Sequence, residues 1–347
     1  MEAYRRYSFA MRGPSRGMND QRPIFHVGLH KTGTTWFQKK FYPRVSGYRF
    51  IPRELVRVTL LAESPLAFDA AEARKRLQID GDEPAIVCEE DLSGVLHNGL
   101  LSLYAAKEMA NQIAAIAPEA RIVLFVRSQT SLAASSYHQY LREGGTGSVH
   151  AYLFPEDYHH PGDVRPLKVP RFDFRQFEFD RLVAHYDTLF GRENVFVFAL
   201  EQFRKEPEQF LDDFCAKLGI DRPPDVANER LNPSFRRGLL PVVRAMNRFT
   251  RRSVIDKSAI VHIPYWYQRR KKLLKWANRR SVFGSPPTAE KLLGTRTFQW
   301  IQRRFRESNL ALERRMAIDL HALGYFGEDG DEIQRPERAR LLQRLKN

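Results

Sequence analysis

Cysteine is scarce in this chain, and its apolar stretches are short. Cys88 and Cys215 are the only cysteines among 347 residues, and neither a C-x-x-C pair nor a His-rich ligand spacing accompanies them. We therefore predict neither a disulfide framework nor a zinc site, and a reducing compartment is the default expectation. No run of about eighteen apolar residues occurs, so we expect no membrane-spanning helix.

Acidic residues are too few to balance the basic ones. The chain has 56 Lys and Arg against 41 Asp and Glu, which gives a formal net charge of +15. This excess indicates an anionic partner, such as nucleic acid, an anionic membrane or a phosphorylated or polyanionic small substrate. The hydrophobic content of 43% is enough for one substantial core and an appended smaller unit.

The first 22 residues lack the continuous apolar segment of a secretory signal and contain five arginines. We interpret residues 1–22 as a flexible basic arm. A mitochondrial-type targeting segment is the alternative, although Glu2 and Asp20 do not suit one.

Four short apolar runs, rich in β-branched and aromatic residues, predict buried strands at 23–27, 84–88, 121–126 and 194–200. Helical patterns occur at 34–42, 64–78, 102–116, 130–142 and 177–190. This alternation predicts an α/β, P-loop-type three-layer fold in which helices flank a central parallel sheet. Ligands of such sheets bind beyond the carboxyl ends of the strands.

The remaining segments suggest a division into three parts. Residues 143–175 are rich in Gly, Pro and His, which indicates a functional loop or lid. A helix is expected at 202–218, and a long amphipathic stretch from about 297 to 323 lies in a helical, basic final third. We predict an arm at 1–22, a core at 23–235, and a mainly helical C-terminal region at 236–347 that packs on the core.

The stretch HVGLHKTGTTWF, residues 26–37, has the glycine spacing of a nucleotide-binding loop but a displaced lysine. Lys31 lies between Gly28 and Gly33, and Thr34 and Thr35 follow where lysine would otherwise stand. Backbone amides, a helix dipole, an ammonium group and two hydroxyls together predict an anion site. The alternative is an ordinary glycine-containing turn with a surface lysine.

HKTGTTW resembles the 5'-phosphosulfate-binding loop of the sulfotransferases, a K-[ST]-G-T-T-x pattern. The resemblance implies that the donor is 3'-phosphoadenosine-5'-phosphosulfate, that no metal is required, and that Lys31 neutralises charge on the leaving phosphate. His30 stands where many relatives have proline. The donor-binding residues implied are His30, Lys31, Thr32, Gly33, Thr34, Thr35 and Trp36.

A second anchor is expected in RIVLFVRSQTSLAASSYHQY. Arg127 ends a strand, and Ser135 follows eight residues later in a helix, so a forked guanidinium and a hydroxyl can meet one phosphate. An arginine and a serine at this separation hold the 3'-phosphate in the sulfotransferases. Ser136 is the neighbouring alternative, and small residues that merely pack a helix are the non-functional reading.

The acceptor hydroxyl needs a general base, and PAIVCEED places Glu89, Glu90 and Asp91 just beyond a strand. Related bacterial sulfotransferases often carry a serine-serine-glutamate turn at this place, so Glu90 is the expected catalytic base beside Lys31 and His30. The alternatives are Glu89, His30, Glu54 and Glu63. Acids at a helix start are the non-catalytic reading.

Several later features receive weaker assignments. Asn232 and Ser234 resemble a turn that related bacterial proteins carry after the core, and no adenosine loop of the R-K-G type is evident. Histidines expected near the acceptor are His138, His159 and His160. Residues 265–280, YWYQRRKKLLKWANRR, suit an anionic membrane, nucleic acid or an anionic glycan. Alternatively, they form a solvated helix whose Leu273, Leu274 and Trp276 face the core.

The sequence therefore predicts a sulfotransferase that acts on a hydroxyl of a carbohydrate or glycolipid. We expect a cytoplasmic location, with the inner face of the membrane and peripheral contact with anionic lipid as an extension, and no nucleic-acid partner. A P-loop kinase that uses ATP and Mg²⁺ and a basic nucleic-acid-binding module are the alternatives. The sequence does not address the oligomeric state.

Overall fold

The computed structural model describes residues 22–158, 172–224, 234–250 and 260–327. Its centre is a five-stranded parallel sheet with the order β2-β3-β1-β4-β5. The strands are β1 (Ile24–His26), β2 (Arg49–Phe50), β3 (Ala85–Cys88), β4 (Arg121–Val126) and β5 (Val195–Ala199). The chain leaves β1 toward β3 and later returns to its other side as β4, so the strand order reverses at β1.

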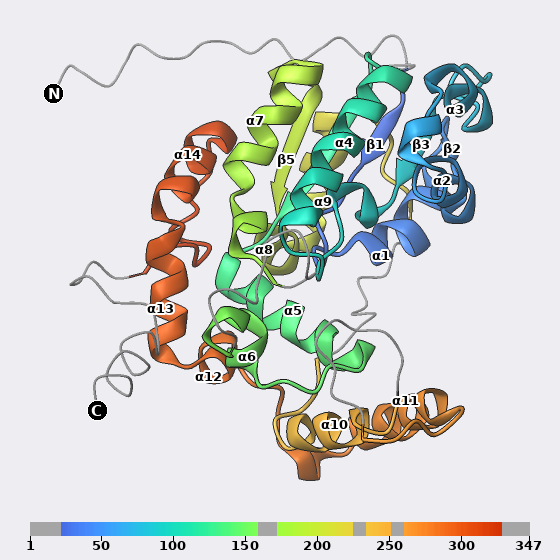
Figure 1. Cartoon of the computed structure of the whole chain (residues 1–347). Helices are drawn as coiled ribbons and strands as arrows, with labels where there is room; N and C mark the ends of the chain where they lie inside the picture. The colour runs from blue at the N-terminus through green and yellow to red at the C-terminus, as the bar shows by residue number, and fades with distance from the viewer. Residues whose placement is uncertain (1–21, 159–171, 225–233, 251–259, 328–347) are drawn as a thin grey trace, which may run out of the picture.

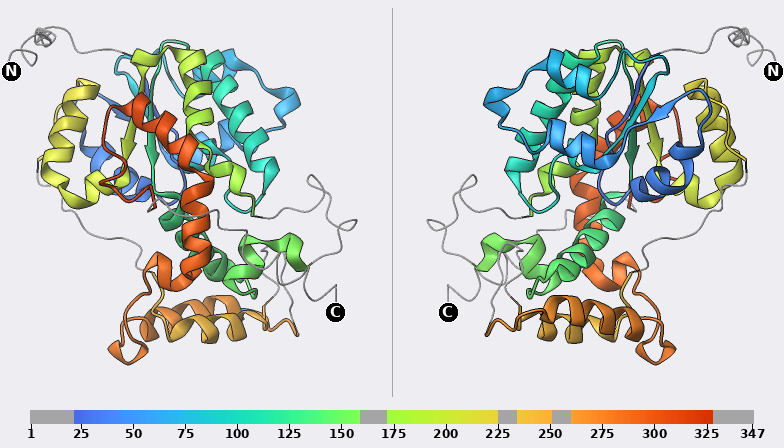
Figure 2. Two further views of the ribbon diagram at one scale, coloured as in Figure 1. Left: turned by 90° about the vertical axis from the view of Figure 1, so that its left-hand side faces the viewer. Right: turned by 90° about the vertical axis from the view of Figure 1, so that its right-hand side faces the viewer.

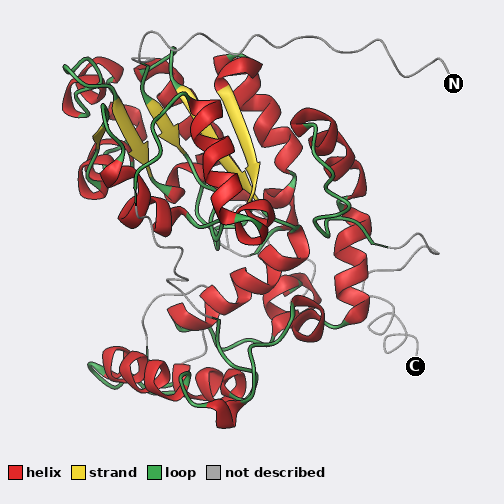
Figure 3. Cartoon of the chain, turned by 180° about the vertical axis from the view of Figure 1, so that it is seen from behind, coloured by secondary structure: helices red, strands yellow, loops and turns green. Residues whose placement is uncertain are grey.

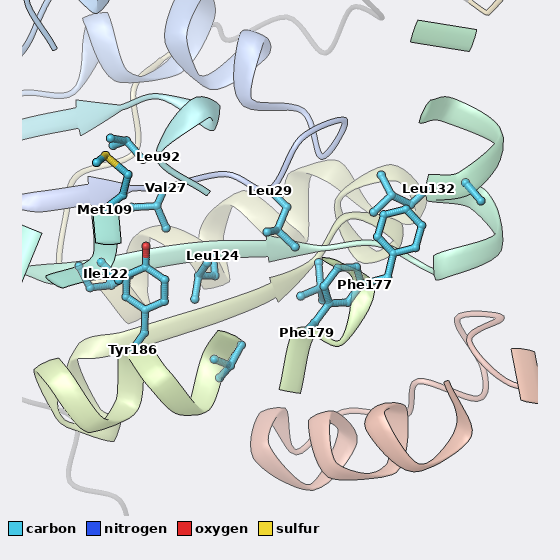
Figure 4. Close-up of a cluster of buried hydrophobic side chains, with 14 of the residues drawn as sticks. Val27, Leu29, Leu92, Met109, Ile122, Leu124, Leu132, Phe177, Phe179 and Tyr186 are labelled. Carbon is cyan, nitrogen blue, oxygen red and sulfur yellow. The ribbon is translucent and has the colours of Figure 1, made fainter. Parts of the chain in front are cut away.

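Helices cover both faces of the sheet because successive strand residues point to opposite sides (Figure 2). One face packs on α4 (Leu100–Ile116) and α7 (Phe179–Phe190), in the cluster drawn in Figure 4. The other face packs on the segment after β1 and on α9 (Pro207–Leu218). Every residue of β1, β3 and β4 is buried, which confirms the predicted three-layer α/β fold.

The structure confirms the four predicted strands and adds, between the first two of them, a strand and an α-helix that the pattern missed. These are β2, which is two half-buried residues long, and α2 (Arg53–Leu60). The predicted helix at 64–78 is shorter, because α3 (Ala70–Arg76) begins only after Asp69, whose side chain accepts the amides of Ala71 and Glu72. A two-residue strand has too few positions to show a period, which explains its omission.

Three further helix predictions were wrong in their extent. The segment 202–218 divides into α8 (Leu200–Lys205) and α9, because Pro207 has no N–H to continue a helix. Residues 34–42 are α-helical only in α1 (Thr34–Trp36) and continue as a π-helical turn, Phe37–Phe41. The stretch 297–323 forms α13 (Thr295–Arg304) and α14 (Arg306–Met316).

The C-terminal region is helical, as predicted, and packs on the core (Figures 1 and 3). Helix α14 lies along α7, while α12 (Ala289–Leu293), α13 and α10 (Leu239–Asn247) contact α5 (Gln129–Glu143). Helix α11 (Trp266–Ala277) packs on α10, and this pair forms the layer farthest from the sheet. Residues 1–21, His159, His160 and Asn232 lie outside the described residues.

Candidate functional site

The loop between β1 and α1 is held against β4 at its start. The amide of Val27 donates to Val123 O (3.1 Å), and the amide of Leu29 donates to Phe125 O (3.3 Å). The side chain of Leu29 is buried in the hydrophobic cluster below the loop (Figure 4). The loop therefore starts from a fixed position at the point where the strand order reverses.

Three residues of this loop have a left-handed backbone: Gly28 (φ 95°), Lys31 (φ 63°) and Gly33 (φ 98°). A Cβ atom at Gly28 would lie 3.1 Å from the Cα of Glu90, so this position needs glycine for space as well as for its φ. A left-handed lysine is uncommon, and such strain is concentrated at ligand sites. The turn brings Lys31 to the carboxyl edge of the sheet.

The threonines of the loop differ in their roles. Thr32 donates its hydroxyl to Leu29 O and is fully buried, and Thr34 makes a longer contact with the same oxygen (3.5 Å). Thr35 is half-buried. The hydroxyls of Thr32 and Thr34 therefore shape the loop, and the amide groups at the start of α1 have no intrahelical acceptor and suit an anion.

Trp36 is part of the core. Its ring is buried and contacts Phe203 (centroids 4.9 Å) and Phe37, and its amide donates to Gly33 O (2.8 Å). The expectation that Trp36 contacts the donor therefore does not suit its position, because both its ring and its N–H are already engaged within the protein. It anchors α1 from behind.

Arg127 joins the end of β4 to both the loop and α5. Its Nη1 donates to Lys31 O and to Ser135 Oγ (both 2.9 Å), and its Nε and Nη2 donate to Ser131 Oγ (2.9 and 2.7 Å). The structure thus brings the predicted pair Arg127 and Ser135 together. Ser136 donates to Leu132 O instead, which makes it the weaker alternative.

Lys31 lies beside the same helix. Its Nζ donates to Gln139 Oε1 (3.0 Å). Burial, reinforced by the nearby Arg142 and Arg127, lowers the pKa of Lys31 to about 8. Burial, followed by the charge of Arg204, lowers the pKa of Arg127 from its usual value.

Neither Lys31 nor Arg127 forms an ion pair with a carboxylate of the described residues. Their partners are a carboxamide, two hydroxyls and a carbonyl. Buried charge is normally paired, so these two cations form an unbalanced positive site that suits an anion with two charged groups.

Beyond β3 the charges are balanced. Glu89 is fully buried and accepts from Arg53 Nε (2.6 Å), Arg53 Nη2 (2.9 Å) and Arg57 Nε (2.8 Å). Burial opposes ionisation of Glu89, but the hydrogen bonds from Arg53 and Arg57 outweigh it and lower its pKa. A carboxylate clamped by two arginines is a poor base, so its position favours a structural role for Glu89.

Glu90 lies at the loop. Its carboxylate accepts from Arg53 Nη2 (2.6 Å) and from Gln38 Nε2 (3.1 Å), and Gln38 also donates to Cys88 O (2.9 Å). Glu90 is one of the charges that raise the pKa of Lys31, so the carboxylate of the expected base interacts electrostatically with the ammonium group of Lys31. Glu90 therefore lies at the same edge as Lys31 and is paired with Arg53.

The other candidate bases are less suitably placed. His30 Nε2 donates to Gly94 O (2.6 Å), so this nitrogen already holds its proton. Glu54 is exposed in the first turn of α2, and Glu63 pairs with Arg76 at the surface.

The sequence interpretation missed a polar row on α5. The row consists of side chains spaced by four residues along one face of this helix: Ser131, Ser135, Gln139 and Glu143. Its first two members contact Arg127, and Gln139 contacts Lys31. Gln139 also donates to Glu143 Oε1 (2.5 Å). The four-residue spacing was visible in the sequence and could have indicated that this face is used.

His97 extends the row toward α6 (Val149–Leu153). Its Nε2 lies 3.3 Å from Glu143 Oε2, and its Nδ1 lies 3.0 Å from Tyr152 Oη. Burial opposes ionisation of Glu143, but its hydrogen bond with His97 helps to lower the pKa. On α5 itself, burial lowers the pKa of His138 to about 4, with Arg142 and Lys31 contributing.

The described residues contain neither a cluster of side chains that could hold a metal ion nor a helix that could span a membrane. No three His, Cys, Asp or Glu side chains in this part of the chain gather in a way that would hold a metal ion. No helix among residues 22–158, 172–224, 234–250 and 260–327 is long and apolar enough to span a bilayer.

Comparison with known proteins gives likenesses of fold alone. No family model and no curated protein matches the chain. A sulfotransferase from Alicyclobacillus acidocaldarius is similar in structure, with 18% identity over 87% of this chain and 98% of that chain, and a TM-score of 0.49. Mouse sulfotransferase SULT7A1 complexed with PAP has 15% identity over 87% and 89% of the two chains, and a TM-score of 0.40. Similarities of this size do not support a functional assignment. Such an assignment depends on the geometry of the site.

Proposed function

We propose that the protein is a sulfotransferase that moves a sulfuryl group from 3'-phosphoadenosine-5'-phosphosulfate to an acceptor hydroxyl. The observation that carries the proposal is the pair of cations formed by half-buried Lys31 and buried Arg127, joined through the Lys31 carbonyl and left without a carboxylate ion-pair partner among the described residues. A donor with one phosphate at each end of its ribose supplies two separate anionic groups for them.

Each end of the donor has its own set of groups in this proposal. Lys31 and the amides of residues 32–35 hold the 5'-phosphosulfate, and Arg127 with Ser135 holds the 3'-phosphate. Since Arg127 also donates to the Lys31 carbonyl, the two cations are fixed relative to each other before the donor binds. Such preorganisation limits the entropy lost on binding.

The transfer step needs a base and a stabilised leaving group. The acceptor oxygen forms a bond to sulfur, and the bond between sulfur and the bridging phosphate oxygen breaks. The acceptor proton passes to the Glu90 carboxylate, and Lys31 stabilises the negative charge that remains on the 5'-phosphate. This chemistry places no demand on a metal ion.

The broader assignments belong to the same proposal. The acceptor is a carbohydrate or glycolipid, the catalytic core comprises residues 23–235, and residues 236–347 form a region packed on it. The location is cytoplasmic. The polar row on α5 supports a polar acceptor, since Gln139, Glu143 and His97 offer donors and acceptors near Lys31.

Calorimetric titration tests the proposal with adenosine 3',5'-bisphosphate, ATP and ATP with Mg²⁺, the first of these in the presence of a chelator. We expect micromolar binding of the bisphosphate in chelator and much weaker binding of ATP. The variant Lys31→Ala should lose this affinity, while Lys39→Ala, which removes an exposed lysine of the following turn, should retain it. Binding of ATP that requires Mg²⁺, with no binding of the bisphosphate, would favour a kinase instead.

Turnover is tested with radiolabelled donor and a panel of sugar, lipid-linked sugar and phenolic acceptors. Transfer to a sugar hydroxyl is the expected result. Transfer to phenols alone would keep the enzyme class and refute the acceptor assignment.

A further inference from the structure

The cationic residues of this protein are concentrated in one part of the chain. Residues 234–288 contain fourteen Lys and Arg and one acidic residue, Asp256. Six of these cations, on and just after α11, are exposed and form no ion pair with any carboxylate of the described residues. They are Arg269, Lys271, Lys272, Lys275, Arg279 and Arg280.

Large apolar side chains are exposed among these cations. Tyr265, at the start of α11, is 76% exposed, Trp276 is 55% exposed and Leu273 is 49% exposed. In a helix with 3.6 residues per turn, Leu273 and Trp276 lie on one side together with Arg269 and Lys272, while Tyr265 directly precedes the first turn. The prediction that Leu273 and Trp276 face the core was wrong, and only Leu274 does so.

The exposed apolar surface continues ahead of the helix. Ile260, Val261 and Ile263 are each exposed by more than 40%. Ile263 and Tyr265, together with Tyr267, also line a cleft of about 560 Å³. Few soluble surfaces combine aliphatic, aromatic and cationic groups without acids, and such patches mark interaction sites.

The opposite side of α11 is firmly packed. The Trp266 indole donates to Met246 O (2.9 Å), and Tyr267 Oη and Arg270 Nη2 donate to Arg142 O (3.2 and 3.0 Å). Helix α11 thus rests on α10 and on the end of α5, in the outermost layer of Figures 1 and 2. On the exposed side, the Arg280 guanidinium lies 4.8 Å from the centre of the Trp276 ring.

We infer that the outer side of α11, with residues 260–265, is a docking surface for an anionic lipid bilayer. The cations pair with lipid phosphates, while Tyr265, Leu273 and Trp276 enter the headgroup region, where aromatic side chains are favoured. Charge complementarity identifies the occupant as anionic. The aliphatic side chains favour lipid over nucleic acid, because a phosphate backbone offers no apolar environment for them.

The surface and the candidate site share a helix. The Arg142 carbonyl, which receives the bonds from Tyr267 and Arg270, ends the same α5 face that carries Gln139 beside Lys31. Docking would therefore place the acceptor side of the site near the membrane. Membrane binding itself does not depend on the proposed sulfotransferase activity.

Vesicle flotation of the full chain tests the inference. We expect binding to vesicles of phosphatidylcholine with one third phosphatidylglycerol, and at least tenfold weaker binding to phosphatidylcholine alone. The triple variant Lys271→Glu, Lys272→Glu and Lys275→Glu should bind anionic vesicles about 100-fold less tightly. The double variant Leu273→Ser and Trp276→Ser should lose about tenfold, because its apolar contact is removed.

A control variant changes the net charge equally on other surfaces: Lys75→Glu, Lys107→Glu and Lys291→Glu, all exposed on α3, α4 and α12. It should retain vesicle binding. All substituted residues are exposed, so melting temperatures and bisphosphate affinity should stay at the parent values. Equal binding to neutral and anionic vesicles, an equal loss in the control, or salt-sensitive binding to an oligonucleotide without vesicle binding would overturn the inference.

Discussion

The two edges of the candidate site hold charge in opposite ways. Beside β4 and α5, half-buried Lys31 and buried Arg127 donate only to neutral oxygens. Beyond β3, by contrast, Glu89 and Glu90 meet the guanidinium group of Arg53 directly. A balanced cluster contributes to the folded state by itself, whereas unbalanced buried cations are costly until an anion arrives. The first edge is therefore the one we propose for the ligand, and most of the second is the one we expect to stabilise the fold.

Glu90 lies on the balanced side, but we propose a catalytic role for it. Its replacement should have the largest effect on the rate of sulfuryl transfer. Glu90→Gln should lower the rate of sulfuryl transfer by about 1000-fold, because the acceptor proton loses its base. Affinity for adenosine 3',5'-bisphosphate should be unchanged, as measured by titration. Glu54→Gln is the matched control and should turn over normally. Undiminished transfer by Glu90→Gln would remove this residue from the role.

Arg127→Gln tests the unbalanced side. We expect bisphosphate affinity to fall about 100-fold, since a charged, two-pronged hydrogen bond to phosphate is lost. The free energy of unfolding should change by less than about 1 kcal/mol, because the arginine has no buried carboxylate to leave unpaired. Calorimetry and urea unfolding measure the two quantities. A large loss of stability with normal bisphosphate affinity would show that Arg127 stabilises the fold and does not bind the ligand.

Arg53→Gln is the corresponding change on the balanced side. It should lower the free energy of unfolding by about 3 kcal/mol, because Glu89 stays buried with only Arg57 left. Bisphosphate affinity should remain near normal. In the parent protein the lowered pKa of Glu89 stabilises the fold at neutral pH, and this contribution is lost as the pH falls through the folded pKa. Acid unfolding of Arg53→Gln should therefore show a shallower pH dependence.

Lys31 should make the affinity for adenosine 3',5'-bisphosphate depend on pH. With a pKa of about 8, it loses its charge between pH 7 and 9, so bisphosphate affinity should fall about tenfold over this interval. The same shift should make the free protein more stable as the pH rises above 8, because the unfolded chain then binds more protons. Lys31→Arg keeps its charge and should flatten the affinity profile. A fall of equal size in this variant would point to another group.

Ser135→Ala should have the smallest effect. Loss of one hydroxyl contact corresponds to about 1 kcal/mol, or roughly fivefold in bisphosphate affinity. Ser136→Ala is the control and should bind normally, since its hydroxyl serves the Leu132 carbonyl. The opposite ranking would show that the neighbouring serine faces the phosphate.

Much of the geometry of the candidate site was predictable from short sequence motifs. The spacing of Gly28 and Gly33 indicated a glycine-containing turn after the first strand, and both residues have a left-handed backbone there. Arg127 directly follows β4, and Ser135 lies eight residues later in the middle of α5, and the two side chains do meet. The position of Glu90 followed from its place after a strand. These inferences succeeded because parallel strands end at one edge of a sheet.

Other features depended on contacts between distant segments. Arg53 and Arg57 come from α2, which no periodic pattern identified, and they decide that Glu89 is balanced. Trp36 was expected at the donor, but Phe203, far along the chain, holds its ring in the core.

The sequence by itself determined four of the five strands, the main helices around them, the glycine-containing turn after β1 and the approximate place of the two cations, because these follow from apolar periodicity and from short motifs of fixed spacing. Only the tertiary structure decided which charges are neutralised. Neutralisation depends on distances of a few ångströms between residues such as Arg53 and Glu89, 36 positions apart in sequence. It likewise decided that Leu274 is buried and Trp276 exposed on the same helix, because burial is set by what packs against a side chain.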